Sequence, residues 1–416
     1  MCSNSFRGAA LTNAVGLLKE ELRQLGSFVM EVADIAKVPA GGALAVDREL
    51  FSGMIDERLR SHPNIEFIAG ELSEIPEGSA ENPVIVATGP LTSKALAASI
   101  QRLTGADQLA FFDAISPILF DESLDHTKLF RMSRYQKGDG DDYLNSPLNK
   151  EQYTAFIEAV AAGEKFGGHE EVEADSIENL RPFEGCMPIE EMLARGPETL
   201  RFGTMKPVGL IDPATGRRPH AVVQLRQDDK AGKTWSLVGF QTRLKHPEQI
   251  RIFRMLPGLE NCEFVRLGSV HRNSFIESPK LLYPTLQFRT KPHLFFAGQI
   301  TGVEGYVEST AGGWLAGWNA AQMVLGKPLH TFSLDTAIGS LHDYISDPER
   351  KHFQPMNISF GLMKGYLAEG EAATKRESKD DRRLRTSERA LGKVAEFKAT
   401  TLSSDPVALI PAYSAV

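Results

Sequence analysis

Two short apolar runs, each ending in glycine, are the clearest pattern of hydrophobic and polar positions along this chain. Residues 84–89 (Val-Ile-Val-Ala-Thr-Gly) follow a polar loop, and residues 294–298 (Leu-Phe-Phe-Ala-Gly) follow a basic one. Continuous apolar runs of this length that end in a turn residue are typical of strands buried in a parallel sheet. An Ala- and Gly-rich stretch over residues 308–325 predicts a helix after the second run. The pattern therefore predicts an α/β domain with a buried parallel sheet.

The long stretch between these two runs has a different character. It contains an aromatic-rich strand candidate at residues 109–115, a helical pattern at 150–162 and an alternating strand pattern at 221–226. We interpret it as an inserted α+β domain. An amphipathic helix is expected over residues 11–21, and another, exposed and rich in charge, over 375–389. The predicted domains are residues 1–92 and 271–350 for the two parts of the α/β domain, 93–270 for the insertion, and 351–416 for a C-terminal helical tail.

Composition narrows the class of protein without identifying it. The chain has 416 residues, and 42% hydrophobic residues is ordinary for a globular protein. No apolar run approaches the length of a membrane span and no leader sequence opens the chain, so a cytoplasmic location without membrane contact is expected. The net charge of −8 argues mildly against a nucleic-acid partner. Basic residues nevertheless cluster, as at Arg131, Arg134 and Lys137 and at Arg217 and Arg218, where solvated surface charge is the simpler explanation.

The three cysteines are Cys2, Cys186 and Cys262. They are too few and too scattered for a disulfide framework or a zinc site, so we expect free thiols and no metal. Cys186 lies between a glycine and a proline-bounded turn, where it is either packed in the core or a nucleophile. A nucleophilic thiol needs basic or dipolar neighbours to lower its pKa. Lys206 and Arg226 are candidates for that role, whereas Cys262 matches no motif and is predicted to be structural.

The glycine turns indicate a ligand at the end of each predicted strand. A residue without a Cβ lets backbone N–H groups approach a phosphate or a ring, and the helix that follows presents its positive end. Gly89 alone is a weak signal, because Ala-Thr-Gly is also an ordinary strand end. The segment from Gly298 to Gly317 is far more specific. The fingerprint G-x-G-x-x-G, which binds a dinucleotide pyrophosphate, and the phosphate-binding loop G-x-x-x-x-G-K-[ST] have no match in these residues.

Several of these segments resemble the folate- and flavin-dependent tRNA (uracil-5-)-methyltransferases in collinear order over nearly the whole chain. The matching segments are residues 2–5 (Cys-Ser-Asn-Ser), 38–48, 200–210, 223–229, 238–242, 271–275 (His-Arg-Asn-Ser-Phe), 302–309 (Gly-Val-Glu-Gly-Tyr-Val-Glu-Ser) and 353–357. The resemblance implies a Rossmann-like FAD-binding domain with a large inserted α+β domain. In that family a unit with the dinucleotide fingerprint precedes the Cys-Ser-Asn-Ser segment. We therefore expect an N-terminally truncated FAD-binding domain that holds FAD weakly.

The resemblance also implies a reaction. Reduced FAD takes the methylene of 5,10-methylenetetrahydrofolate onto its N5 and passes it to C5 of a T-loop uridine in tRNA, which gives ribothymidine. NADH or NADPH supplies the electrons, and no obligate protein partner is implied. Cys186 would add to C6 of the uracil, and Cys2 would help to remove the C5 proton or protect the flavin. Because the uridine is stacked in the folded T-loop, its base has to be extruded to react.

The remaining site residues follow from the same resemblance. Those expected around the flavin are Gly89, Gly298, Gln299, Gly302, Val303, Glu304, Gly305 and Tyr306. Those expected around the substrates are His271, Arg272, Asn273, Lys206 and Arg226, with His271 stacked on the pterin, although a lone histidine in a strand is more often part of a core.

Two other interpretations stay open at this point. The related family that modifies wobble uridines also uses FAD and folate, but its chains are much longer, and the short tail after Asn357 leaves no room for their C-terminal helical domain. An inactive, truncated flavoprotein remnant is favoured only by the missing fingerprint.

Overall fold

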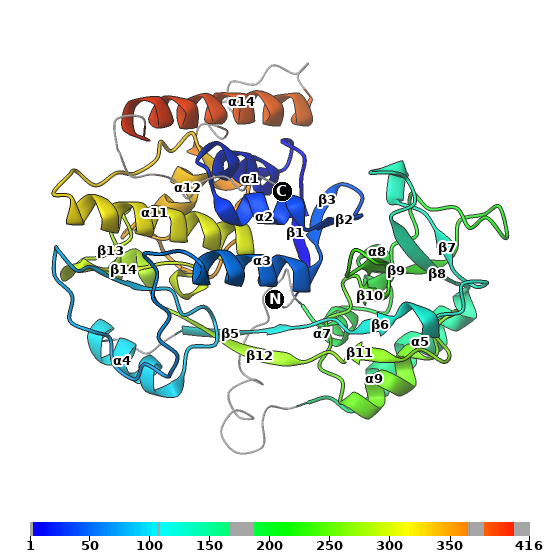
Figure 1. Ribbon diagram of the computed structural model, residues 1–416. Coiled ribbons are helices and arrows are strands. Elements are labelled where there is room, and N and C mark those ends of the chain that lie inside the picture. Colours follow the sequence, from blue (N-terminus) through cyan, green and yellow to red (C-terminus); the bar gives the residue numbers. More distant parts are fainter. Residues whose placement is uncertain (1–2, 106–108, 167–186, 365, 367–377, 403–416) are drawn as a thin grey trace. The chain divides into compact units, whose positions relative to one another are not determined.

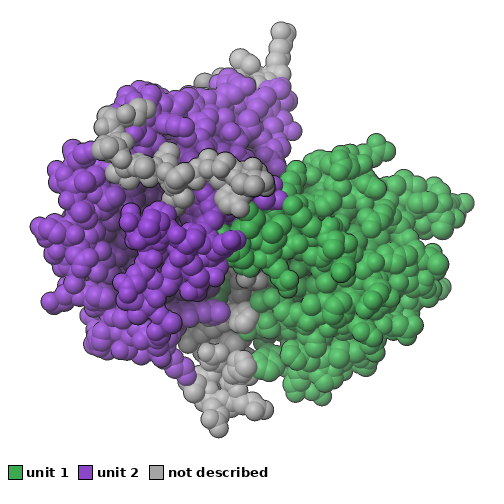
Figure 2. Space-filling view, in the orientation of Figure 1, with its two compact units in different colours: residues 1–5, 36–54, 110–273 green, residues 6–35, 55–109, 274–416 purple. Residues whose placement is uncertain are grey.

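The computed structural model describes residues 3–105, 109–166, 187–364, 366 and 378–402 (Figure 1). The chain forms two compact units, each built from segments that are distant in the sequence (Figure 2). Unit 1 consists of residues 1–5, 36–54 and 110–273, and unit 2 of residues 6–35, 55–109 and 274–416. The chain enters unit 1 within strand β5 (Leu109–Ala114) and leaves it within strand β12 (Val270–Phe275), and these two strands pair with each other. The domain bounds proposed from the sequence stay a prediction.

Unit 1 is built on a six-stranded antiparallel sheet. In spatial order its strands are β11 (Phe264–Arg266), β6 (Ile118–Phe120), β10 (Thr234–Leu237), β9 (Ala221–Gln227), β8 (Tyr143–Leu148) and β7 (Phe130–Arg131). The central strand β9 is buried at all seven positions, so both of its faces are covered. Its pairing with β8 places Leu225 opposite Leu144 and Gln224 opposite Asn145. The strand predicted at residues 221–226 is confirmed. A short antiparallel pair, β2 (Lys37–Val38) and β3 (Ala43–Val46), also lies in this unit.

Four helices of unit 1 pack beside or near this sheet: α5 (Lys150–Ala162), α7 (Ile189–Ala194), α8 (Thr199–Phe202) and α9 (His246–Phe253). Helix α5 has the bounds that the sequence predicts. It begins at a capping box, in which the Asn149 side chain accepts from the Gln152 backbone N–H at 2.8 Å and the Gln152 side chain accepts from the Asn149 N–H. Its buried face carries Tyr153, Phe156 and Val160. The helical periodicity and the cap therefore specify this element together.

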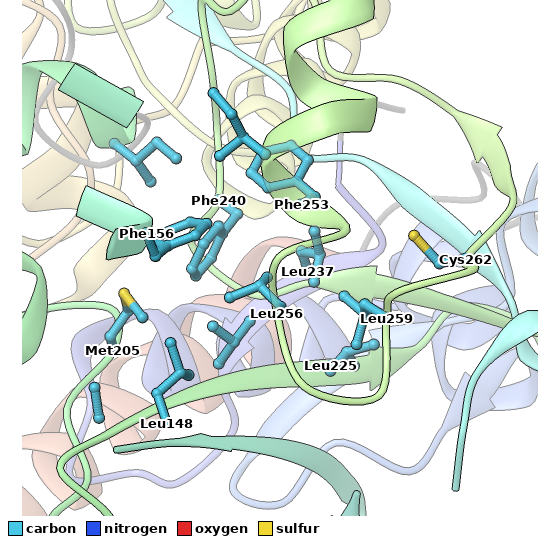
Figure 3. Close-up of a cluster of buried hydrophobic side chains, with 14 of the residues drawn as sticks. Leu148, Phe156, Met205, Leu225, Leu237, Phe240, Phe253, Leu256, Leu259 and Cys262 are labelled. Carbon is cyan, nitrogen blue, oxygen red and sulfur yellow. The ribbon is translucent and has the colours of Figure 1, made fainter. Parts of the chain in front are cut away.

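The core of unit 1 joins the sheet to these helices (Figure 3). The ring of Phe240 lies 6.1 Å from the rings of both Phe156 and Phe253, and Leu225 and Leu237 approach from the sheet. Cys262 is a free, fully buried thiol in the same cluster. Burial raises the pKa of Cys262 to about 11, so it is protonated and unreactive at neutral pH. The structural role predicted for Cys262 is confirmed.

Unit 2 contains a three-stranded sheet in the order β13 (Gln287–Phe288), β14 (Lys291–Phe296) and β4 (Val84–Val86). Strands β14 and β4 are parallel, with Phe296 opposite Val86, as the apolar runs predict. Val86 and Phe296 join Ile100 of helix α4 (Lys94–Thr104) in a small core. The prediction of continuous burial was wrong for β4, because Ile85 is 39% exposed. This strand is at the edge of the sheet, and successive side chains of a strand face opposite ways.

Several helices of unit 2 pack around helix α1 (Ala14–Gln24). Helix α1 packs on α11 (Tyr306–Val324), α12 (Ala337–Tyr344) and α14 (Lys379–Phe397). Helix α14 confirms the charged helix expected over residues 375–389 as far as these residues are described, and Ser378 caps its first turn. The other helices in or entering this unit are α2 (Phe28–Ile35), α3 (Arg48–Arg60) and α10 (Ser278–Leu281), and strand β1 (Ser5–Gly8) leads into it.

Helix α1 differs from the amphipathic helix that the sequence predicts, because Lys19 and Glu21 are both fully buried. The two carboxylate oxygens of Glu21 accept hydrogen bonds from the backbone N–H groups of Ala337 and Ile338, at 2.7 and 2.9 Å. These are the first two residues of α12, whose N–H groups have no partner within the helix. Burial raises the pKa of Glu21 to about 8, and the two N–H donors oppose that shift only in part.

This raised pKa predicts a pH-dependent contribution to stability. Glutamate titrates near pH 4.5 in the unfolded chain, whereas Glu21 keeps its proton in the folded protein up to about pH 8. The folded state thus binds more protons than the unfolded state between these values, so this contribution is lost as the pH rises from about 4.5 to 8. We expect the free energy of unfolding of wild type, relative to Glu21→Gln, to fall by at most about 1.4 kcal/mol per pH unit in this window. Urea unfolding at pH 5, 6.5 and 8 measures it, and a difference that stays constant or grows with pH would contradict the assignment.

Candidate functional site

The parallel pair of strands in unit 2 ends in two open glycine turns. Gly89 follows β4 and Gly298 follows β14, and the two strands run in the same direction, so both turns leave the same edge of the sheet. The backbone φ is +70° at Gly89 and +75° at Gly298, a conformation that side chains rarely adopt. A Cβ at Gly89 would meet nothing within 4 Å, and one at Gly298 would meet only Ser309, at 3.8 Å. The carboxyl edge of a parallel sheet is where α/β proteins bind nucleotides, and both turns are open to a ligand.

The loop that follows Gly298 is fixed by a segment from far along the chain. Gly302 has φ +82°, and a Cβ there would lie 2.4 Å from the ring of Phe353, so only glycine fits. The Met356 N–H donates to the Gly302 carbonyl oxygen at 3.1 Å, and the Met356 carbonyl oxygen accepts from the Glu304 N–H at 2.9 Å. The Asn357 side chain donates to the Glu304 carbonyl oxygen. Val303 is fully buried in this loop. The loop thus has one defined path toward the start of α11.

The side chains of this loop are also held in place. Gln299 donates from its amide to the Glu304 carboxylate at 2.6 Å. Gly305, with φ +111°, directly precedes helix α11, and Tyr306 begins it with its ring 5.6 Å from the ring of Phe6. The residues that the sequence places around a flavin, from Gly298 to Tyr306, therefore form one continuous structure with Gly89 at the neighbouring strand end.

Three charged side chains lie beneath this loop, and the sequence analysis did not select them. The fully buried Glu308 forms an ion pair with Arg7 and accepts a hydrogen bond from the Ile358 N–H at 3.0 Å. Lys19 donates to the carbonyl oxygen of Gly8 at 2.7 Å. Burial raises the pKa of Glu308, and Arg7 opposes that shift. Burial lowers the pKa of Lys19 to about 7, with the charge of Arg7 acting in the same direction. We call the buried Lys19 and Glu308, together with Arg7, whose side chain is 39% exposed, the buried charge cluster.

Arg226 lies in unit 1, at a cavity of about 200 Å³ that Ser3, Arg48 and Gln241 also line. Its guanidinium donates to the Asn4 side chain at 2.9 Å and to the Ser3 hydroxyl at 3.2 Å. Asn4 in turn donates to the Gln227 carbonyl oxygen at 3.0 Å, so the start of the chain is fixed to strand β9. Burial lowers the pKa of Arg226 from its usual value. Arg226 therefore positions the residues that directly follow Cys2.

A second ion pair lies next to this cavity. Arg48 donates to the Asp228 carboxylate at 3.0 Å, and both side chains are largely buried. Burial raises the pKa of Asp228, and Arg48 limits that rise. The cavity is thus lined by two guanidinium groups, those of Arg226 and of Arg48, and Asp228 compensates the charge of Arg48. This arrangement suits an anionic or carbonyl-rich ligand.

The other predicted site residues have different environments. Lys206 is exposed and lines a different cavity from Arg226, although both belong to unit 1. Asn273 is buried on β12, and its amide nitrogen has no hydrogen-bond partner in the described part of the chain. His271 and Arg272 belong to the same strand, but their side chains lie outside the described residues. Cys2 and Cys186, the predicted catalytic thiols, also lie outside the described residues.

Membrane-spanning helices and clusters of metal ligands are the other features that would bear on function. Within the described ranges, no helix is long and apolar enough to cross a membrane. No group of three or more His, Cys, Asp or Glu side chains that could hold a metal ion occurs in that same part of the chain.

Comparison with known proteins relates this geometry to characterised families. The sequence model of the family described as Glucose inhibited division protein A matches residues 1–328. The protein called methylenetetrahydrofolate–tRNA-(uracil-5-)-methyltransferase in Geobacter sulfurreducens is 55% identical over 96% of this chain and 88% of its own length. The protein of the same name in Symbiobacterium thermophilum is 57% identical over 87% of this chain and 80% of its own length. In Heliobacterium modesticaldum the identity is 54% over 97% of this chain.

Solved structures agree on the fold. GidA of Aquifex aeolicus matches with a TM-score of 0.67 in its form II crystal and 0.65 in its form I crystal, at 16% sequence identity in both. The match covers 96% of this chain and 66% of the form II chain, so this chain spans just under two thirds of that protein. At this identity the likeness establishes the α/β fold alone.

Proposed function

The chain belongs to the Glucose inhibited division protein A family and, within it, to the methylenetetrahydrofolate–tRNA-(uracil-5-)-methyltransferases, and from this premise we propose that it methylates C5 of a T-loop uridine in tRNA. The carbon donor is 5,10-methylenetetrahydrofolate, and the product is ribothymidine. The observation that carries the proposal is the extent of the similarity, which runs through almost the whole chain. A cytoplasmic location is part of the same proposal.

A flavin dinucleotide fits the carboxyl edge of the parallel strands in unit 2. The open glycines Gly89 and Gly298 leave room for close approach of a ring or a phosphate, and helix α11 begins beside them. Reduced FAD, when bound, supplies the one-carbon transfer and reducing chemistry that amino-acid side chains lack. NADH or NADPH is the reductant that we propose. Gln299, Glu304 and Tyr306 would bind and orient the flavin, because the loop that carries them has a single, well-fixed path.

The chain's own side chains activate the pyrimidine in this proposal. The Cys186 thiolate adds to C6 of the uracil, which makes C5 nucleophilic, and Cys2 then helps to remove the C5 proton or protects the flavin. Arg226 positions the segment after Cys2 through Ser3 and Asn4. Asn273, whose buried amide nitrogen has no partner among the described residues, would bind the folate together with His271 and Arg272. The proposal requires a lowered pKa for the Cys186 thiol, as a nucleophilic cysteine generally does.

The carbon source tests the proposal. Unmodified tRNA transcript incubated with the protein, FAD and NADPH should gain ribothymidine only when 5,10-methylenetetrahydrofolate is supplied, because the methyl carbon comes from the folate. Nucleoside digestion and mass spectrometry measure the product, and a transcript with cytidine at the T-loop target position is the control. If S-adenosylmethionine supported methylation and folate did not, the proposed function would be wrong.

A further inference from the structure

A basic and aromatic surface in unit 1 lies around Lys206, which the sequence placed near the substrates and which lines a different cavity from Arg226. Residues 195–220 contain five Lys and Arg residues and two Asp and Glu residues, although the whole chain has a net charge of −8. Within this segment a cavity of about 500 Å³ is lined by Arg201, Phe202, Lys206, Arg218 and His220. We call these five residues the cationic surface. Positive charge concentrated on one surface of an acidic protein indicates an anionic partner.

Phe202 presents its ring to solvent on this surface. It is the last residue of α8 and is 73% exposed, more than most large apolar side chains of the described chain. The Arg201 guanidinium lies 5.6 Å from the ring centre. Arg201 is itself fixed, because it donates to the His220 carbonyl oxygen at 3.0 Å and pairs with Glu198. The ring is thus held beside a cation, and its other side is free for stacking.

Lys206 and Arg218 supply charge that the described residues do not neutralise. Neither forms an ion pair within the ranges that the structure describes, whereas Arg201 and Arg243 of the same unit are both paired. Lys206 is exposed, and its backbone is fixed because the Arg134 guanidinium donates to its carbonyl oxygen. Unpaired, exposed cations on a fixed backbone are suited to contact phosphate groups.

A second exposed ring stands beside this surface. Tyr135, in the short helix η2 (Arg134–Gln136), is 61% exposed and has φ +58°, which is uncommon for a residue with a side chain. Its ring lies against Gly209, where a Cβ would be only 3.0 Å from the ring. The Tyr135 N–H also donates to the Gly209 carbonyl oxygen at 3.3 Å. Two exposed rings therefore stand on or against the segment that contains the unpaired cations.

We propose that the cationic surface, together with Tyr135, binds an unpaired nucleotide of the substrate tRNA and its neighbouring phosphates, with the base stacked on Phe202. Exposed rings interleaved with free cations are the chemistry that recognises single-stranded RNA, because any base can stack and each phosphate carries a charge. A protein partner could cover the two exposed rings, but it would not account for the two exposed cations, Lys206 and Arg218, beside them. The inference rests on the proposed function, since it assumes a tRNA substrate, and it assigns the contact to residues outside the flavin and thiol sites.

Two variants separate stacking from charge. Phe202→Ala removes the ring from an exposed position, so folding should be unaffected. We expect its affinity for a fluorescent T-arm hairpin RNA to fall about five- to a hundredfold, with the dependence on salt unchanged. The double variant Lys206→Gln/Arg218→Gln should bind the RNA more weakly than wild type at low salt. The slope of log K against log[salt], where K is the association constant, should become less steep by roughly 0.7 for each phosphate that the variant no longer neutralises. Fluorescence anisotropy from 50 to 200 mM salt measures both effects.

The chain offers matched controls in unit 2. Phe67 is also an exposed ring, with the Arg60 guanidinium 4.7 Å from its centre, and Lys291 and Lys351 are exposed cations. Phe67→Ala and Lys291→Gln/Lys351→Gln should bind the hairpin as wild type does. Two results would contradict the inference and leave the proposed function standing, provided that wild type binds the RNA. In the first, the Phe202 and Lys206/Arg218 variants bind the RNA as tightly as wild type. In the second, the control variants lose as much affinity as these variants do. If wild type does not bind the RNA, the proposed function fails and the inference fails with it.

Discussion

Cys186→Ala is expected to lower the rate of tRNA methylation by about a thousandfold or more, with the fold of the protein retained. C5 of uracil is a weak nucleophile until a thiolate adds at C6, so loss of the Cys186 thiol removes the step on which the proposed reaction depends. Ala is only slightly smaller than Cys, so the melting temperature should change little. Ribothymidine formation under single-turnover conditions measures the effect, in a preparation whose wild-type form is active.

Cys262→Ala is the matched control for this prediction. Cys262 is buried in the core of unit 1 with its pKa raised to about 11, so its removal should cost about 1 kcal/mol of stability and leave methylation intact. A tRNA with 5-fluorouridine at the target position provides a second readout. The reaction normally ends with loss of the C5 proton, and with fluorine at C5 there is no such proton to lose, so the adduct with the thiol persists. Wild type should form a covalent adduct with it, and Cys186→Ala should form none. An adduct and near-normal turnover with Cys186→Ala would transfer the nucleophile's role to Cys2 or exclude thiol addition.

The elements of the fold were predictable where local pattern and local chemistry agree. Helix α5 follows from its periodicity and from the capping box of Asn149 and Gln152, three residues apart. The parallel sheet that contains β4 and β14 follows from two similar apolar runs, each ending in a glycine, whereas the direct pairing of these two strands was not predicted. Gly302 could be identified as part of a glycine-rich loop, but its contact with Phe353 could not, because it depends on where the later segment packs. Short-range patterns therefore predict elements, and long-range packing decides their contacts.

The buried polar side chains were the part that the sequence did not reveal. Lys19 and Glu21 stand among leucines in a helix where polar residues are normally solvent-exposed, and both are buried. Their burial depends on distant partners, since Glu21 caps a helix 316 residues later and Arg7 pairs with Glu308, 301 residues away. Arg226 was selected as a substrate ligand, yet its side chain donates to Asn4 and Ser3, near the start of the chain. Charges within an apolar helical face are the one local signal that could have indicated these sites.

The buried charge cluster leads to the second large effect. Glu308→Ala is expected to lower the free energy of unfolding of unit 2 by about 1–3 kcal/mol, less than the loss of a fully buried ion pair because the Arg7 side chain is 39% exposed. The change removes the only carboxylate of the cluster and with it the ion pair between Glu308 and Arg7. It also removes the acceptor for the Ile358 N–H, next to the segment that fixes the Gly302 loop. Two of the three tryptophans, Trp314 and Trp318, belong to α11, so fluorescence during urea unfolding measures this unit.

Three further variants distinguish an ion-pair effect from a general packing effect. Glu74→Ala breaks the exposed pair of Glu74 with Arg102 in the same unit and should cost under about 1 kcal/mol. Glu308→Gln keeps the volume and an acceptor for Ile358, so its cost should be smaller than that of Glu308→Ala.

Arg7→Met, the third variant, leaves the buried carboxyl group of Glu308 without its closest cation, and the sign of the resulting pH dependence is the sharpest test. Burial already raises the pKa of Glu308, and loss of Arg7 raises it further, so the folded state keeps a proton that the unfolded state releases above about pH 4.5. The cost of Arg7→Met should therefore be small near pH 5 and grow as the pH rises toward 8. Lys19 limits this growth, because its pKa rises once the charge of Arg7 is gone and it becomes the counter-ion. A cost that is the same at pH 5 and pH 8 would mean that Glu308 contributes through packing and not through its charge.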